Sequence, residues 1–307
     1  MKFIKIIYNP VSGRGAAEDR VNHVARILLD RGYTVNKYAT RAQGDGRREA
    51  KASSNEPWDL IVAAGGDGTI NEVASGLYES GENIPLALLH EGTMNDIAKH
   101  LGISNDPVVF CNMIDDFHLI PIDLGKAQDR FFLNVVAGGM ITAVAHRTPT
   151  ELKNVLGRAA YYLEVVKELT SSGLRAYKLR IQHDDAEEVG RFNLFMISNS
   201  PTIGGFEQLM PLAQMQDGLL DCIFIRESES IQEAAELFLS VLKGEHINHS
   251  KVLYFRTSKV EIHAENHGDL ELDFDGEYAG GLPVKIEVIP SAIRILVADD
   301  QTDRQAP

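Results

Sequence analysis

The stretch that decides the fold is LIVAAGGDGTINEVASGL, residues 60–77. Its apolar start predicts a short buried strand, and Ile70, Val73, Ala74 and Leu77 then recur at helical spacing. Three glycines, an aspartate and a threonine join the two patterns. Glycine lets the backbone approach a ligand closely, and a helix N-terminus directs free N–H groups and a positive dipole end into the same space. This junction is therefore typical of a phosphate site.

On both sides of this junction, strand and helix patterns alternate through the first 120 residues. The pattern predicts strands at 2–8, 33–40, 60–64 and 85–89. It predicts helices at 47–54, 96–101 and 106–115, and one more that carries Val21, Val24, Ala25 and Leu28 on one face. Such alternation indicates an α/β domain, a parallel sheet with helices on both faces.

The character of the sequence changes after about residue 120. Strand-like segments separated by turn residues follow one another, interrupted by helical patterns at 151–170 and 230–243. This succession predicts a mainly β, sandwich-like second domain. We expect an α/β domain over 1–120, a β-sandwich domain over 121–298 and a polar tail over 299–307.

Composition narrows the classes of partner. The chain has 307 residues, 44% of them hydrophobic, and a net charge of −14. A nucleic-acid-binding protein generally needs a basic surface, so we expect no nucleic-acid partner. The start, MKFIKIIYNP, has no signal-peptide pattern, and no apolar run reaches a membrane-spanning length. We expect a cytoplasmic protein.

Two further polar turns follow predicted strands of the first domain. They are NPVSGRG (9–15) and EGTMND (91–96). The carboxyl ends of parallel strands meet at one edge of a sheet, so these turns are expected to lie beside GGDGT (65–69). Thr69 and Glu72 also fit a capping box. Neither the P-loop motif nor the dinucleotide fingerprint is present.

In this order, NPVSGRG, GGDGTINEV and GTMND resemble the diacylglycerol kinase catalytic-domain family, particularly its soluble bacterial lipid kinases. The resemblance continues through FLNVVAGG (132–139), NSPTIGGF (199–206), PLAQMQDGLLD (211–221) and DFDGEYAGG (273–281). It implies a nucleotide-binding α/β domain, a β-sandwich domain for the lipid substrate and an active site in the cleft between them. It also implies ATP and Mg²⁺ as cofactors.

The resemblance places the ATP phosphates at the strand-end turns. The residues that we expect to line the nucleotide site are Asn9, Pro10, Ser12, Gly13, Thr40, Gly65, Gly66, Asp67, Gly68, Thr69, Glu72, Gly92, Thr93, Asn95 and Asp96.

Phosphoryl transfer needs charge neutralisation and a group that accepts the hydroxyl proton. Asp67 can hold Mg²⁺ directly or through water, because hard cations prefer oxygen ligands; a helix cap is the alternative reading. Asp273, Asp275 and Glu277 alternate, which predicts one shared strand face, and a solvated acidic face is the alternative. By resemblance, Asp275 or Glu277 supplies the catalytic carboxylate. We prefer Glu277 because its longer side chain reaches further.

The segment MQDGLLD (215–221) has two carboxylates around a glycine turn. The resemblance implies a structural Mg²⁺ bound by Asp217 and the carbonyls of Gln214 and Leu219, with Asp221 in support. An ordinary Asp-Gly turn remains the alternative.

A basic segment interrupts the acidic chain. Residues 146–180 carry seven Arg or Lys against three Glu and include the predicted helix 151–170. A cationic amphipathic helix can contact an anionic bilayer, although it can equally pack on its own domain. We therefore expect peripheral contact with an anionic membrane at its inner face, and we leave a homodimer open.

One motif departs from the family. The family usually has Pro-x-Gly-Thr before the third turn, whereas this chain has His90 and Glu91 before Gly92. An acid at this place predicts repulsion of phosphates or a changed nucleotide preference.

The sequence favours an ATP-dependent lipid kinase that phosphorylates diacylglycerol or a related lipid, giving phosphatidic acid or an analogue. An NAD kinase, which shares Gly-Gly-Asp-Gly-Thr, and a catalytically idle nucleotide or lipid sensor are the alternatives. The Gly-Thr-x-Asn-Asp turn and the late Asp-Gly-Glu favour the lipid kinase.

Overall fold

The computed structural model describes residues 2–92, 94–139, 175–265 and 270–299. Contacts divide the chain into two compact units, 1–124 with 290–307 and 125–289. The sequence pattern predicted a boundary near 120 and assigned the last strand to the second domain, but residues from Pro290 onward group with the first unit. Thr93 and the predicted helix 151–170 lie outside the described residues.

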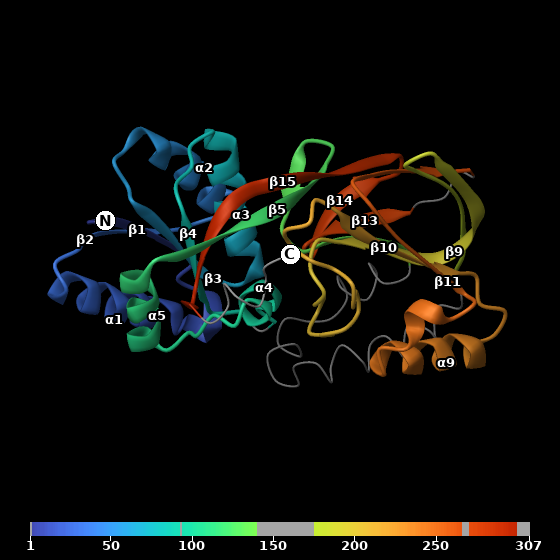
Figure 1. The fold of residues 1–307 in the computed structure, drawn as a ribbon, viewed down its shortest axis with the longest axis horizontal. Helices are drawn as coiled ribbons and strands as arrows, with labels where there is room; N and C mark the ends of the chain where they lie inside the picture. The colour runs from blue at the N-terminus through green and yellow to red at the C-terminus, as the bar shows by residue number, and fades with distance from the viewer. Residues whose placement is uncertain (1, 93, 140–174, 266–269, 300–307) are drawn as a thin grey trace. The chain divides into compact units, whose positions relative to one another are not determined.

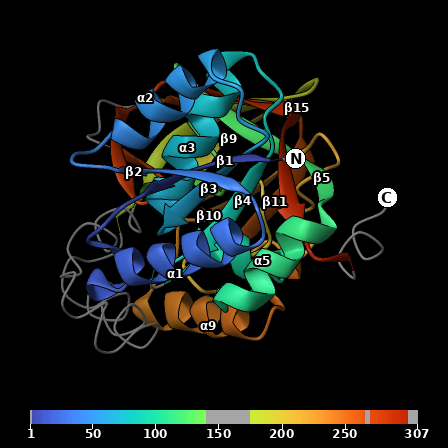
Figure 2. The ribbon, with the colours of Figure 1, turned by 90° about the vertical axis from the view of Figure 1, so that its left-hand side faces the viewer.

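The first unit contains a parallel sheet with helices on both faces, as predicted. Its strands lie in the order β2-β1-β3-β4, all parallel, and the end of β15 (Val284–Val297) pairs with β4 in parallel. Helices α2 and α3 cover one face, and α1 and α5 cover the other (Figures 1 and 2). Its elements are β1 (Phe3–Tyr8), η1 (Ser12–Gly15), α1 (Ala17–Asp30), β2 (Thr34–Ala39), α2 (Asp45–Ala52), η2 (Ser53–Asn55), β3 (Leu60–Gly65), α3 (Asp67–Ser80), β4 (Leu86–His90), α4 (Asp96–His100) and α5 (Pro107–Asp116).

Burial in this unit follows from the two covered faces. All six residues of β3 are buried, which accounts for its unbroken apolar run. Helix α1 buries the four predicted residues together with Ala17. Helices α2 and α3 pack so closely that a Cβ atom on Gly76 would lie 2.2 Å from the Arg47 carbonyl oxygen. Glycine is therefore required there for helix contact.

The strand order also fixes where a ligand can bind. β1 has β2 on one side and β3 on the other, so the chain order reverses between β1 and β3. In open α/β sheets, ligands bind beyond the carboxyl ends of the strands at such a switch point. The turns that follow β1 and β3 are therefore placed at the expected binding edge.

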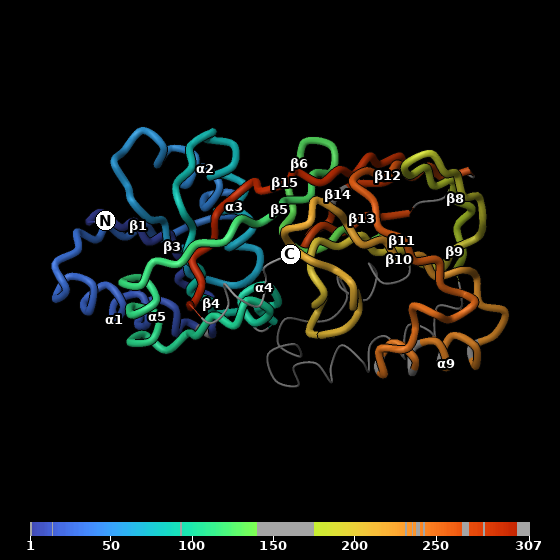
Figure 3. Tube along the Cα trace, in the orientation of Figure 1, coloured from blue at the N-terminus to red at the C-terminus, as the bar shows by residue number. Residues whose placement is uncertain are grey.

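The second unit is antiparallel and rich in β-strands, in agreement with the predicted fold class. Residues 186–192 of β9 pair with β8, and residues 194–198 pair with β7 and β10. The trace in Figure 3 shows β8 beside β9 and β11 beside β10. The elements after α5 are β5 (His118–Ala127), β6 (Arg130–Phe132), β7 (Val135–Gly139), β8 (Tyr177–His183), β9 (Ala186–Ser198), β10 (Leu220–Arg226), α9 (Ile231–Leu242), η3 (His246–Asn248), β11 (Val252–Thr257), β12 (Lys259–Ala264), β13 (Glu271–Phe274), β14 (Glu277–Gly281) and β15.

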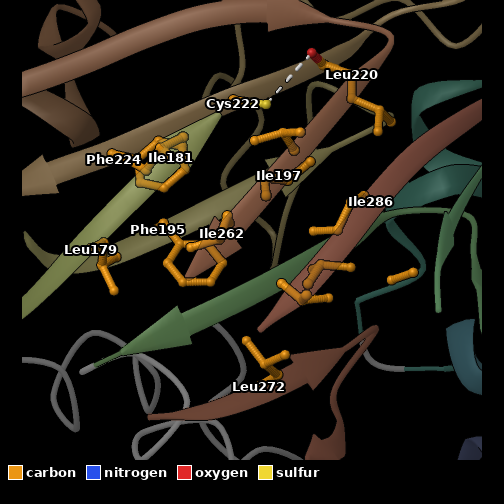
Figure 4. Packing of buried hydrophobic residues seen from close by; sticks show 14 of the residues in the cluster. Leu179, Ile181, Phe195, Ile197, Leu220, Cys222, Phe224, Ile262, Leu272 and Ile286 are labelled. Atoms are coloured by element: carbon orange, nitrogen blue, oxygen red, sulfur yellow. Dashed lines mark hydrogen bonds between the residues drawn. The ribbon is translucent and has the colours of Figure 1, made fainter. Parts of the chain in front are cut away.

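Strand periodicity builds two buried clusters in this unit. Alternate side chains of β10, such as Cys222 and Phe224, enter the main core with Phe195 and Ile262 (Figure 4). The intervening side chain of Ile223 enters a second cluster with residues of the loop 206–219 and of α9. Because successive strand residues face opposite sides, β10 is buried on both faces.

No helix in the described ranges is long and apolar enough to cross a membrane.

Candidate functional site

Four strand ends of the first unit are linked by backbone hydrogen bonds at one edge of the sheet. The N–H of Asn9 donates to Ala64 O at 2.9 Å, and the N–H of Thr40 donates to Tyr8 O at 2.8 Å. The N–H of Glu91 donates to Gly65 O at 2.7 Å. The structure therefore brings together the three turns and the Thr40 position that the sequence singled out.

Glycines allow these turns to touch. A Cβ atom on Gly92 would lie 2.7 Å from the Gly66 Cα and 2.6 Å from Asn95 Oδ1. A Cβ atom on Gly13, whose φ is +59°, would lie 3.0 Å from the Glu91 carbonyl oxygen. At Gly68, by contrast, no described atom would lie within 4 Å of an added Cβ. The turns are therefore closely packed at Gly13 and Gly92, whereas the start of α3 at Gly68 has open space beside it.

Side chains also hold the turns in shape. Asn95 Oδ1 accepts the Gly92 N–H at 2.7 Å, and Asn95 Nδ2 donates to Gly92 O at 2.7 Å. Asn9 Oδ1 accepts the Val11 N–H at 3.1 Å, and the N–H of Ser12 donates to Asn9 O at 3.2 Å, across Pro10. Both asparagines therefore shape backbone that the sequence assigned to nucleotide binding.

Asp67 is the carboxylate at this edge. Its Oδ2 accepts the Asn95 N–H at 2.9 Å, while its Oδ1 is buried and has no hydrogen-bond partner among the described residues. Burial raises the pKa of Asp67, and the backbone N–H groups of Asn95 and Asp96 together with the charge of Lys99 oppose this increase. A buried carboxylate oxygen without a donor fits a cation, because Mg²⁺ prefers oxygen ligands.

The predicted capping box is wrong. Helix α3 begins at Asp67 after Gly66, so Thr69 lies inside the first turn, where its side chain packs against Gly65. Glu72 turns to another helix and accepts the N–H groups of Gly44 and Gly46 at 2.6 and 3.0 Å, at the start of α2. A capping box needs the threonine at the N-cap position, but the N-cap is Gly66, three residues before Thr69.

His90 and Glu91 are both buried. His90 Nε2 donates to Ile103 O at 2.9 Å, and burial lowers the pKa of His90, which favours the neutral ring. Glu91 forms an ion pair with Arg20, which also donates to Asn105 O at 2.8 Å. Burial raises the pKa of Glu91 and Arg20 opposes the increase. The phosphate repulsion expected from the sequence is therefore countered by a cation that the sequence reasoning missed.

An Arg20→Met variant should be less stable, because it leaves the Glu91 carboxylate buried without its cation. We expect the free energy of unfolding to fall by about 2 kcal/mol, less than for a fully buried pair, since the Arg20 side chain is 29% exposed. Urea denaturation measures the loss. The double variant Arg20→Met, Glu91→Gln should recover most of it. A double variant no more stable than Arg20→Met would contradict the pairing.

In the second unit, Asp275 and Gly276 form a turn. They connect β13 to β14, with φ values of +50° and +91°, and Phe274 pairs with Glu277 across the turn. Two positive φ values in a two-residue hairpin are typical of a type I′ turn. The prediction that Asp273, Asp275 and Glu277 share one strand face is therefore wrong, because the strand ends at Phe274.

The Asp275 carboxylate accepts backbone N–H groups of three consecutive residues. The donors are Leu133 at 3.1 Å, Asn134 at 3.2 Å and Val135 at 2.7 Å. In return, the Asp275 N–H donates to Val135 O at 3.0 Å. Asp275 therefore fixes the turn against the segment before β7. Buried Asp273 supports the same turn by accepting the Gly276 N–H at 2.7 Å.

Ser198 and the start of the motif NSPTIGGF (199–206) hydrogen-bond to the residues directly before β7. Ser198 Oγ donates to Asn134 O at 2.9 Å, Ser200 Oγ donates to Asn134 Oδ1 at 2.8 Å, and Asn199 Nδ2 donates to Leu133 O at 3.3 Å. All three donor residues are fully buried. These buried hydrogen bonds tie the start of this motif to Leu133 and Asn134, directly before β7.

Glu277, at the start of β14, is half-buried and forms an ion pair with Arg130 at 3.2 Å. Arg130 also donates to Tyr278 O at 3.0 Å and lies over the Phe274 ring, 5.2 Å from its centroid. The contacts with Tyr278 and Phe274 hold Arg130 in place, and Arg130 in turn orients Glu277. Its role was not apparent from the sequence, because nothing local distinguishes it from a surface arginine.

Asp217 and Asp221 lie together, but around an arginine. Arg256 pairs with both carboxylates, and the Leu219 N–H donates to Asp217 Oδ1 at 3.0 Å. The Gln214 residue is exposed. Across the described ranges, no group of three His, Cys, Asp or Glu side chains is placed to hold a metal ion. These residues, as arranged, do not fit the structural Mg²⁺ that the resemblance implied.

Comparison with known proteins also divides the chain into two parts, although the second match includes residues 290–297, which contacts group with the first unit. Residues 4–127 match the family described as the diacylglycerol kinase catalytic domain. Residues 134–297 match the family described as the YegS C-terminal NAD kinase beta sandwich-like domain.

Curated relatives named diacylglycerol kinase cover almost the whole chain. One from Staphylococcus haemolyticus is 34% identical over 97% of this chain and 89% of its own length. One from Staphylococcus aureus is 34% identical over 97% of this chain and 93% of its own length.

Solved structures from Bacillus anthracis have the same fold. A putative diacylglycerol kinase has a TM-score of 0.83 at 24% identity, covering 97% of this chain and 96% of that one. A second has a TM-score of 0.81 at 25% identity, covering 97% and 98%. With the family matches and the curated relatives, the chain therefore belongs to the diacylglycerol kinase family of ATP-dependent lipid kinases, phosphotransferases with an alcohol group as acceptor.

Proposed function

We propose that this protein transfers the γ-phosphoryl group of ATP to the hydroxyl of diacylglycerol or a closely related lipid. The observation that carries the proposal is the edge at the β1/β3 switch point, where the turns after β1, β3 and β4 contact one another around Asp67. The family matches support the same reaction and do not favour an NAD kinase.

In this proposal, the phosphates bind at the turn after β1 and at the start of α3. Gly68 leaves open space there, and the N-terminus of a 14-residue helix provides N–H groups and a positive dipole end. Gly13 and Gly66 allow the backbone to approach the phosphates closely. Thr40, Gly92 and Asn95 complete the edge. Thr93, predicted for the same site, lies outside the described residues.

Asp67 is the residue proposed to hold Mg²⁺, through the buried oxygen that has no donor among the described residues. When bound, the ion supplies positive charge against the phosphoryl oxygens as the transfer proceeds. Asn95 and Asp96 keep the carboxylate in place through their backbone N–H groups. These backbone contacts position the negative charge of Asp67, which is the charge proposed to hold Mg²⁺.

Glu277 is the proposed proton acceptor. The Asp275 carboxylate already accepts three backbone N–H groups, so its lone pairs serve the turn. Glu277 is half-buried and held by Arg130, which leaves a carboxylate that is oriented without being enclosed. General-base help at the lipid hydroxyl is then the role of Glu277, and Asp275 positions the turn that carries it.

We further propose that the protein acts at the surface of an anionic membrane, where its lipid substrate resides. The support is the basic composition of residues 146–180, including Arg147, Lys153, Arg158 and Lys167. Basic residues near an anionic surface each contribute about 1 kcal/mol to binding. A homodimer is compatible with this proposal but is not required by it.

A labelling assay tests the proposed function. Purified protein is incubated with γ-labelled ATP and Mg²⁺, with a panel of lipids in mixed micelles, and with NAD in a parallel reaction. We expect label in phosphatidic acid or in the phosphorylated analogue of one related lipid. Label in NAD alone would contradict the proposal, and absence of transfer to every acceptor would indicate a sensor.

A further inference from the structure

Four side chains contact one another where the loop 206–219 joins β10. They are Asp217, Asp221, Tyr254 and Arg256, and we call them the Arg256 cluster. Asp221 lies on β10 directly opposite Arg256 on β11 in the antiparallel register. Directly opposed residues of a strand pair have neighbouring side chains. The guanidinium group is therefore placed by the sheet itself, next to both carboxylates.

Every carboxylate oxygen of the Arg256 cluster has a donor or a cation. Asp217 Oδ1 accepts the Leu219 N–H at 3.0 Å, and Asp217 Oδ2 pairs with Arg256 Nη2. Asp221 Oδ1 accepts the Tyr254 hydroxyl, and Asp221 Oδ2 lies 3.4 Å from Arg256 Nε. A divalent ion could bind these carboxylates only by displacing the arginine.

Burial makes a cation necessary here. Asp221 is fully buried, and its two carboxylate oxygens contact the Tyr254 hydroxyl and the Arg256 guanidinium group. A buried carboxylate is costly unless it is paired and hydrogen-bonded. Arginine remains charged at any ordinary pH, so it supplies a permanent positive charge.

The loop that the cluster closes is part of the fold. Leu209, Met210 and Ala213 belong to the second buried cluster, and His246 Nε2 donates to Leu209 O at 2.8 Å. The loop is therefore fixed by apolar contacts along its length and by the Arg256 cluster where it joins β10. Loss of the Arg256 charge should therefore destabilise the end of the loop that joins β10.

We propose that Arg256 is the built-in cation of this loop and takes the place of the structural Mg²⁺ implied by the resemblance. The second unit then folds without a divalent ion, whatever the requirement of phosphoryl transfer. The inference concerns the stability of the loop, so it stands or fails independently of the reaction that the protein catalyses.

Thermal melts without nucleotide test the proposal. All melts use an Asp67→Asn background, which removes the carboxylate proposed to hold Mg²⁺ at the nucleotide site. The melting temperature of this otherwise wild-type chain should be the same in EDTA and in Mg²⁺, Mn²⁺ or Ca²⁺. Arg256→Gln should melt roughly 5–10 °C lower in EDTA, because the two carboxylates lose their cation. Added divalent ions should raise the melting temperature of this variant, and Asp217→Asn in the same background should abolish the response. Arg191→Gln, which breaks the exposed pair with Glu227, is the matched control and should melt like the wild type.

Arg256→Lys covers the case in which Arg256→Gln does not fold. It retains a positive charge and should melt between the wild type and any folded Gln variant, without a response to divalent ions. Mn²⁺ binding is measured in parallel in an Asp67→Asn background, which removes the proposed nucleotide-site carboxylate. Mn²⁺ binding that disappears on further Asp217→Asn substitution, or a wild-type melting temperature for Arg256→Gln, would overturn the proposal.

Discussion

An Asp67→Asn variant should lose most of its lipid kinase turnover while it remains folded. The substitution keeps an oxygen for the Asn95 N–H but removes the negative charge proposed to hold Mg²⁺. Because a metal ion supplies several kcal/mol of charge stabilisation in the transition state, we expect turnover to fall by about 10²–10⁴-fold. Initial rates with saturating lipid and ATP measure the effect.

The Asp67→Asn variant should be at least as stable as the wild type. Burial raises the pKa of Asp67, so the native state binds its proton more tightly than the unfolded chain does. The ionised side chain therefore costs folding free energy at neutral pH, and a neutral amide removes that cost. We expect the urea midpoint to stay equal or to rise.

Asp59→Asn is the matched control, because Asp59 stands just before β3 as Asp67 stands just after it. Asp59 Oδ2 accepts the N–H groups of Lys2 and Phe3 at 2.6 and 2.9 Å. These hydrogen bonds hold the pKa of Asp59 below its ordinary value. This control should lose some stability and retain turnover. Full turnover in folded Asp67→Asn would remove Asp67 from the mechanism.

The first unit could be predicted from the sequence because its signals are local. Each buried strand is a short apolar run, and each helix carries a stripe at helical spacing, as in β3 and α3. Parallel pairing then places the carboxyl ends of the strands together without any knowledge of tertiary contacts. The convergence of Asn9, Thr40 and Gly65 follows from this geometry alone.

The turn at Asp275 was misread for a physical reason. A two-residue hairpin joins two strands without breaking the alternation of acidic and apolar residues, so the period-two pattern runs through it. The local signal for the turn was nevertheless present, because Asp-Gly between strand-like residues favours a type I′ turn. Weighing that dipeptide against the alternation would have placed Asp275 outside the strand.

The cations of both units could not be predicted, because their partners are set by tertiary structure. Arg256 meets Asp221 through the register of β10 and β11, and Arg20 meets Glu91 through the packing of α1 near the end of β4. Neither arginine has a sequence neighbour that marks it. The acidic residues were visible in motifs, whereas the residues that neutralise them were not.

Glu277→Gln should lower turnover by about 10²–10⁴-fold, the usual contribution of a general base. Glutamine preserves the volume and a hydrogen bond to Arg130 but cannot accept the hydroxyl proton. The Arg130 ion pair has 40% and 38% of its side-chain surfaces exposed. Its loss should therefore cost at most about 1 kcal/mol of stability. The KM for ATP should remain unchanged, because the proposed phosphate turns belong to the first unit.

Asp275→Asn separates positioning from proton transfer. An amide has one acceptor oxygen where the carboxylate has two, so the three N–H groups of Leu133, Asn134 and Val135 lose part of their acceptor. Hydrogen bonds to charged groups contribute about 1.5–3 kcal/mol, and we expect a loss of that size in unfolding free energy. The reduction in turnover should be smaller than for Glu277→Gln.

The comparison of these two variants decides which carboxylate is the base. Glu277→Gln should show little turnover and lose at most about 1 kcal/mol of stability, and Asp275→Asn should show a larger loss of stability with more turnover. If Asp275→Asn lost turnover more severely at unchanged stability, the two roles would be reversed. If both variants were folded and phosphorylated lipid at the wild-type rate, the proton would leave by another route. The Asp275–Glu277 turn, held by Arg130 and the polar network at Asn134, would then serve the fold alone.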